Sequence, residues 1–191
     1  MSKINATVKI TLEGLEAPQV WRELSIPLNI TFEQLHQIIQ AAFGWEDSHL
    51  YAFCERNLRD LITINCPIDE DAVVKANEVV ISNLMINLFN RKIYTKDSVP
   101  FKYIYDYGDS WTHQIDVLTI EYDSAEYITL KNGNGACPPE DIGGVPIYEA
   151  IKNGEIEIGL PPGFDPDYFD QSLAKARLRE LERIIIASYR Q

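Results

Sequence analysis

The stretch YIYDYGDSWTHQI, residues 103–115, gathers side chains that could do chemistry around one glycine. Asp106 and Asp109 flank Gly108, and His113 follows on the next segment. A carboxylate that accepts a hydrogen bond from an imidazole fixes its tautomer and raises its basicity, which suits general-base or metal chemistry. In the structural alternative, His113 is a core residue bonded to one neighbour, and Asp106 or Asp109 only closes a turn.

The register of this hairpin separates the two interpretations. In a two-residue loop that starts at Gly108, Asp106 lies diagonally across from His113, about 7–8 Å away between Cα atoms and within side-chain reach. In a three-residue loop from the same glycine, Tyr105 faces His113 and Asp106 points to the other side of the sheet. The sequence leaves both registers open.

A second group, ACPPEDIGG at residues 136–144, sets a cysteine beside two prolines and two acids. Carboxylates raise the pKa of a nearby thiol, so Cys137 is a poor nucleophile. The prolines stiffen the backbone, and the two glycines permit a tight bend or a close backbone approach. We expect a rigid loop that forms one wall of a pocket and carries Glu140 and Asp141.

A third group, GWEDSHLYAF at residues 44–53, contributes Trp45 and His49. His49, His113 and Asp106 could together form a metal site of mixed ligands. No HxxxH, HxH or CxxC spacing supports that site, so these three residues are weak candidates and no metal or other cofactor is expected.

The elements that must position these groups follow from periodicity. Alternation in residues 6–15 and the segment 20–28 predict a first hairpin. Thr31 and Gln34 have the spacing of a capping box, and the apolar stripe that follows predicts a helix that Gly44 ends. Residues 49–54 then predict a third strand.

The later segments predict a central hairpin, a loop and two helices. Residues 131–146 contain four glycines and three prolines and predict a loop, followed by a short helix near residues 147–154. Asp165 precedes a proline suited to the first helical position, and Asp170 can cap the long final helix. Its predicted buried stripe consists of Leu173, Leu178, Leu181 and Ile185.

These elements predict one α+β domain over residues 1–191, with a mixed or antiparallel sheet. Its opening order of strand, strand, helix, strand resembles a β-grasp unit, and a central hairpin and a long C-terminal helix follow. There is no internal repeat, Walker loop, GxSxG elbow or dinucleotide glycine fingerprint.

Charge and cysteine content limit the partners and the compartment. The formal net charge is −12, from 29 acidic and 17 basic side chains, so binding to a phosphate backbone is not expected. The three cysteines are too few for a disulfide framework, and neither a secretory signal nor a membrane span is predicted. We therefore expect a cytoplasmic protein.

Four motifs give the sequence a family resemblance: HQIIQAAFGWEDSHLYAF, YIYDYGDSWTHQI, ACPPEDIGG and FDPDYFD. In this order they resemble the motifs of proteins named for the third open reading frame of an Ri plasmid, across nearly the whole chain. The family has no established activity, although some relatives look like resolvases or repressors.

The resemblance also singles out residues and departures. It places emphasis on His36, Gln40, Trp45, His49, Tyr105, Asp106, Gly108, Asp109, Trp111, His113, Cys137, Pro138, Pro139, Glu140, Asp141, Gly143, Gly144, Asp165 and Phe169. Three departures are Tyr107 where phenylalanine is usual, Lys175 where asparagine is usual, and a short segment before Phe164 where relatives often have a longer stretch with His and Glu.

The leading functional hypothesis is a non-catalytic binding or regulatory module with an acidic-aromatic cleft for a peptide, a protein partner or a small cationic ligand. The first alternative is a metal-assisted hydrolase that uses His49, His113 and Asp106. The second is a DNA-associated accessory protein, by analogy alone. The candidate ligand-binding residues are Trp45, His49, Tyr105, Asp106, Asp109, Trp111, His113, Cys137, Glu140 and Asp141.

Overall fold

The computed structural model describes residues 4–55, 63–94, 101–122, 127–157 and 159–188. Within these ranges the chain forms one eight-stranded sheet and four helices. In chain order the elements are β1 (Ile4–Leu12), β2 (Trp21–Pro27), α1 (Phe32–Phe43), β3 (Tyr51–Glu55), β4 (Ile64–Asn65), β5 (Val74–Lys75), α2 (Ser82–Tyr94), β6 (Phe101–Tyr105), β7 (Trp111–Tyr122), β8 (Thr129–Asn134), α3 (Gly144–Lys152) and α4 (Gln171–Ser188).

The sheet is antiparallel except at one edge. Its strand order is β5-β4-β3-β6-β7-β1-β2-β8, and only β4 and β5 pair in parallel. The predicted α+β class, the first hairpin and the central hairpin are confirmed. The opening order of strand, strand, helix, strand is present as β1, β2, α1 and β3, but β3 pairs with β6, so two strands separate it from β1.

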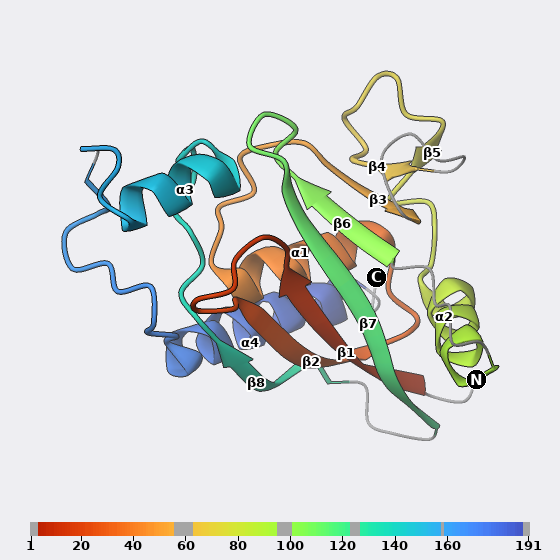
Figure 1. Cartoon of the computed structure of the whole chain (residues 1–191). Coiled ribbons are helices and arrows are strands. Elements are labelled where there is room, and N and C mark those ends of the chain that lie inside the picture. Colours follow the sequence, from red (N-terminus) through yellow and green to blue (C-terminus); the bar gives the residue numbers. More distant parts are fainter. Residues whose placement is uncertain (1–3, 56–62, 95–100, 123–126, 158, 189–191) are drawn as a thin grey trace.

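Local signals set the bounds of α1. Thr31 and Gln34 form the predicted capping box, and Gly44 ends the helix in the left-handed conformation at φ 99°. The apolar stripe of Leu35, Ile38 and Ile39 is fully buried. Figure 1 shows α1 and α4 together against one face of the sheet, and they contact each other there.

The start and the buried face of α4 differ from the prediction. The helix begins at Gln171, and Asp170 Oδ1 accepts from the backbone N–H of Leu173 at 2.9 Å, as a cap does. Asp165 instead closes a separate turn, in which its carboxylate accepts from the N–H of Asp167 at 3.0 Å. A helix start at the Asp165–Pro166 step was therefore wrong.

The inward stripe of α4 also shifts by one residue at its beginning. Leu173 is 47% exposed, whereas Ala174, Leu178 and Ile185 are buried. One residue turns a helix by about 100°, so Ala174, and not Leu173, continues the row set by the later positions.

The predicted loop at residues 131–146 begins with part of a strand. Residues up to Asn134 belong to β8, which pairs with β2 at the edge of the sheet. Polar and glycine residues hid this strand because an edge strand buries little of its surface. A Cβ on Gly133 would lie 2.5 Å from the Phe169 ring, so the strand needs a residue without a side chain there.

None of the helices in the described ranges combines the length and apolar character that a bilayer-spanning helix requires.

Candidate metal centre

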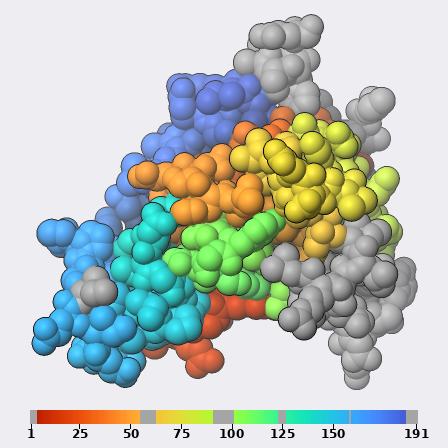
Figure 2. All heavy atoms as spheres, turned by 90° about the horizontal axis from the view of Figure 1, so that it is seen from above, coloured from red at the N-terminus to blue at the C-terminus, as the bar shows by residue number. Residues whose placement is uncertain are grey.

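Three segments that are distant in sequence meet at one end of the sheet. They are residues 44–50 after α1, the tip of the β6–β7 hairpin, and residues 136–144 between β8 and α3. Figure 2 shows them as adjoining orange, green and cyan surfaces. The contact follows from the sheet order, because β3 carries the first segment to the side of β6.

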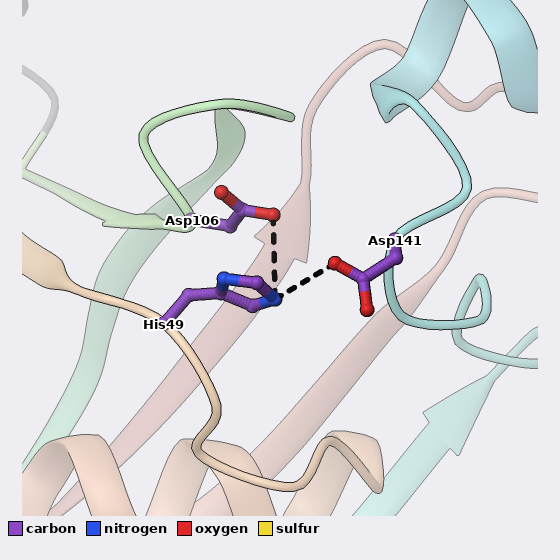
Figure 3. Close-up of side chains that lie close together, drawn as sticks. All are labelled: His49, Asp106 and Asp141. Carbon is purple, nitrogen blue, oxygen red and sulfur yellow. Dashed lines mark ion pairs between the residues drawn. The ribbon is translucent and has the colours of Figure 1, made fainter.

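His49 lies at the point where the segments meet. Its Nε2 is 3.0 Å from Asp141 Oδ1, 3.7 Å from Asp106 Oδ2 and 3.9 Å from Glu140 Oε2. Figure 3 shows the Asp106 and Asp141 carboxylates on two sides of this nitrogen. The side chains of His49 and Asp106 are 28% and 11% exposed, whereas that of Asp141 is 74% exposed.

The Nε2 atom of His49 is buried and makes no hydrogen bond, although Asp141 lies at hydrogen-bonding distance. One N–H could in any case serve only one carboxylate. A metal ion could be bound by all of them at once. Ligand atoms about 2.1 Å from an ion are about 3.0–3.6 Å from their neighbours, close to the separations around Nε2.

The ligand atoms of His49, Asp106 and Asp141 all lie within 4.8 Å of one another. Small side-chain rotations would bring all three to one ion. Among the described residues, these three form the potential ligand group, and His113 is not part of it.

The hairpin tip has neither of the registers considered from the sequence. Tyr105 pairs with Trp111 and Tyr103 with His113, so residues 106–110 form the loop. Asp106 and Ser110 both have left-handed backbones, at φ 55° and 56°. The longer loop removes Asp106 from the strand, and its carboxylate therefore reaches His49 and not His113.

The Asp106 carboxylate has two separate roles. Oδ1 accepts from the N–H of Gly108 at 2.9 Å and so stabilises the turn. Oδ2 is the oxygen that faces His49. Asparagine could keep the first contact and a left-handed backbone while losing the negative charge, which makes Asp106→Asn an informative variant.

Hydrogen bonds hold Glu140 against the other two segments. The hydroxyl of Tyr105 donates to Glu140 Oε1 at 3.1 Å and accepts from the N–H of Ser48 at 2.9 Å. The N–H of Glu46 donates to Glu140 Oε1 at 2.8 Å, and the indole N–H of Trp45 donates to the Pro138 carbonyl at 3.0 Å. These contacts fix the loop that carries Asp141.

His113 is a core residue, and its proposed pairing with Asp106 was wrong. It is fully buried, its ring packs edge-on against Phe43 and Trp45, and neither ring nitrogen has a hydrogen-bond partner. Burial lowers the pKa of His113 to about 3, which backbone groups of Tyr103 and Trp111 only partly oppose. The imidazole is therefore neutral at neutral pH, and a hydrolase that uses it is not supported.

The aromatic candidates lie beneath the acidic group. Tyr105 and Trp111 are fully buried, and Trp45 is 7% exposed and packs on both of them. Their ring faces are covered by one another, so they cannot receive a ligand cation. They support the carboxylates from below, and the cation–π recognition expected from the sequence is not available.

The Cys137 thiol is not readily deprotonated and is therefore a poor nucleophile. Burial raises the pKa of its thiol, Glu140 raises it further, and Arg22 and Arg177 oppose the shift. The Cys137 thiol is half-buried, those of Cys54 and Cys66 are buried, and none of the three is in a disulfide. Asp109, the remaining candidate, accepts from the N–H of Gly143 at 2.9 Å and joins the hairpin tip to the loop.

The same junction gives a stability prediction. Gly144 has φ +74°, and a Cβ there would lie 2.4 Å from the Asp109 carbonyl oxygen. We expect Gly144→Ala to lower the free energy of unfolding by about 2 kcal/mol more than the control Gly154→Ala, measured by urea denaturation. Gly154 has the same φ and nothing within 4 Å of a Cβ, so the difference isolates the close approach. Equal losses in the two variants would mean that the hairpin and loop are not in contact.

Two residues of the arrangement were missed from the sequence. Arg22 is buried, and its guanidinium lies over the Phe169 ring, 3.6 Å from the ring centroid. Asp47 Oδ1 lies 2.7 Å from His36 Nε2 and accepts a hydrogen bond from it when that nitrogen carries the proton. The one available signal for Arg22 was its position in a strand pattern, where it falls at the same alternate positions as the apolar residues Val20 and Leu24. No sequence pattern pointed to Asp47.

Known proteins are similar to this chain in sequence and in fold. A family model described as Plasmid pRiA4b ORF-3-like protein matches residues 5–156. Uncharacterized protein y4hQ of Sinorhizobium fredii is 35% identical over 140 residues, which are 72% of this chain and 66% of that protein's length. The crystal structure of MM3350 from Methanosarcina mazei Go1, a protein of unknown function, has a TM-score of 0.71 at 30% identity and covers 90% of this chain and 96% of that one.

Proposed function

Because the chain belongs to the plasmid pRiA4b ORF-3-like protein family, whose matched relatives are described as uncharacterised or of unknown function, we propose its function from its own geometry: it binds a divalent metal ion. His49 Nε2 and the carboxylates of Asp106 and Asp141 are the ligands. The observation that carries this proposal is the buried, unbonded Nε2 of His49, which faces carboxylates from two other segments.

The donor set favours a particular class of metal. One imidazole nitrogen with carboxylate oxygens suits Zn²⁺, Mn²⁺ or Fe²⁺, whereas Ca²⁺ and Mg²⁺ prefer oxygen ligands alone and Cu⁺ prefers sulfur. Glu140 Oε2, 3.9 Å from Nε2, is a candidate for a further ligand or for a partner of a bound water. The exposure of Asp141 leaves one side of the site open to solvent or to a ligand.

This proposal keeps the binding role of the leading hypothesis from the sequence but assigns a metal ion as the ligand, which the sequence analysis did not expect. The nearby thiol of Cys137 has a raised pKa, which makes it a poor nucleophile. All three cysteines lie outside disulfides, and we propose a cytoplasmic location, as expected from the sequence.

The test is equilibrium dialysis of chelator-treated protein against Zn²⁺ and Mn²⁺. We expect one ion per chain, and we expect Asp106→Asn to weaken the affinity by about 100-fold while the melting temperature of the metal-free protein stays close to that of the wild type. The turn is preserved because asparagine can still accept from the N–H of Gly108.

Asp116→Asn is the matched control, because Asp116 lies on β7, where it accepts from the Gln114 amide at 3.0 Å. We expect it to bind the ion as the wild type does. No bound ion in the wild type, or equal affinity in wild type and Asp106→Asn, would refute the proposal. A large loss of stability in Asp106→Asn would show that the carboxylate serves the fold.

A further inference from the structure

A cavity of about 390 Å³ lies beside the His49 group, between α1 and the turn after β4. Its volume is within the range of small-molecule sites. In Figure 2 this region lies where the orange segment after α1 adjoins the yellow segment after residue 63. The lining residues that matter for its chemistry are Glu33, His36, Asp47, His49, Tyr51 and Cys66.

Tyr51 is the first unusual feature of this cavity. The residue is 2% exposed, and its hydroxyl is buried without a hydrogen-bond partner. The other tyrosines nearby are bonded: Tyr103 to His36 and Gln40, and Tyr105 to Ser48 and Glu140. A buried hydroxyl without a hydrogen bond destabilises the fold, so its retention calls for a physical reason, and a ligand that bonds to it is one.

The position of Tyr51 is fixed by its neighbours. Its ring stacks on the imidazole of His36, with centroids 3.6 Å apart and planes 6° from parallel. His36 is held in turn by the hydroxyl of Tyr103 and by Asp47, each at 2.7 Å. The phenol therefore cannot turn to find another partner without breaking this stack.

The charge of the cavity is the second feature. Glu33 and Asp47 line it, and none of the residues described as lining it is lysine or arginine. The cavity thus offers an oxygen acceptor in a negative field.

We infer that this cavity binds a small molecule that carries a primary ammonium group. The ammonium donates one N–H to the phenol oxygen of Tyr51, and the carboxylates of Glu33 and Asp47 balance its charge. This site goes beyond the proposed metal site: it shares His49 as a wall but needs no ion for binding.

The test uses three probes of equal length and different charge. Butylammonium, butanol and butyrate are titrated separately into the chelator-treated full chain, and binding is followed by ligand-observed NMR. We expect butylammonium to bind at least about tenfold more tightly than butanol, and butyrate not to bind. Comparable binding of butanol or butyrate would overturn the inference, because it would show a cavity that does not select a cation.

Tyr51→Phe separates a ligand role from a structural one. We expect the variant to bind butylammonium about tenfold more weakly, with a melting temperature equal to or above that of the wild type, because the change removes an unbonded polar group. The matched control Tyr122→Phe removes an exposed hydroxyl at the end of β7 and should change neither property. Unchanged butylammonium binding in Tyr51→Phe would refute the assignment.

Asp47→Asn provides the complementary change. Asparagine can still bond to His36, but it removes one negative charge, so butylammonium affinity should fall by about tenfold. Unchanged affinity would contradict the role assigned to Asp47. Since these titrations contain no metal ion, a failure of the metal proposal leaves their outcome intact, and failure here leaves metal binding to be judged by dialysis.

Discussion

Arg22→Lys will lower the free energy of unfolding by about 4 kcal/mol. The guanidinium donates to four backbone carbonyls, at 2.8–3.1 Å: Ala42 by Nε, Trp21 and Asn134 by Nη1, and Gly135 by Nη2. These carbonyls belong to α1, β2, β8 and the residue after β8. A lysine carries one ammonium on a flexible stem and cannot reach all four, so buried acceptors would lose their partners.

Stacking adds to this loss. The Arg22 guanidinium lies over the rings of Phe43 and Phe169, at 4.9 and 3.6 Å from their centroids. Burial lowers the pKa of Arg22 to about 10, yet the group stays charged at neutral pH because its carbonyl partners solvate it. Arg22 therefore connects α1, the edge strand β8 and the segment before α4 through its hydrogen bonds and its stacking on Phe169.

Urea denaturation at pH 7 measures the effect, with Arg183→Lys as the control. Arg183 is an exposed arginine of α4 that pairs with Glu180, and its replacement should change stability by less than about 0.5 kcal/mol. A loss below about 1 kcal/mol in Arg22→Lys would contradict the described packing.

Acid will destabilise the protein through His113. The folded-state pKa of His113 is about 3, against an ordinary value of 6.5. Below pH 6.5 the unfolded chain takes up a proton that the folded chain refuses, so stability is present above that pH and is lost as the pH falls toward 3. Between pH 7 and 4.5 this residue alone should cost about 2 to 3 kcal/mol.

His113→Phe isolates that contribution. The variant keeps an aromatic ring in the contact with Phe43 and Trp45 and cannot take up the proton. We expect it to lose about 2 to 3 kcal/mol less stability than the wild type when the pH is lowered from 7 to 4.5, as measured by urea denaturation at both values. Equal losses in the two proteins would show that His113 is accessible to protons in the folded state.

The elements that local signals define were predictable from sequence. Thr31 and Gly44 bound α1 because a cap side chain and a glycine backbone act on the nearest residues alone. The alternation of His113 with Trp111 and Ile115 was consistent with a core residue, which is what it is. The loop at the hairpin tip could not be predicted, because residues other than glycine adopt left-handed conformations at Asp106 and Ser110.

The partners within the candidate site required the fold. One of the two registers left open by the sequence paired Asp106 with His113, which is close in the chain, whereas the structure brings Asp106 to His49 through the pairing of β3 with β6. The four carbonyls around Arg22 come from distant segments, and no local pattern reports such a contact. The three sequence segments that form the site, residues 44–53, 103–115 and 136–144, were nevertheless identifiable. Their acidic, aromatic, histidine and cysteine residues are uncommon together in turns.

The central claim is that His49, Asp106 and Asp141 bind one metal ion together. Anomalous diffraction from crystals grown with Zn²⁺ or Mn²⁺ tests it most directly. We predict a single strong anomalous peak within about 2.0–2.2 Å of His49 Nε2, Asp106 Oδ2 and Asp141 Oδ1. The absence of an anomalous peak between these three atoms, in crystals of protein that has been saturated with the ion, would contradict the claim.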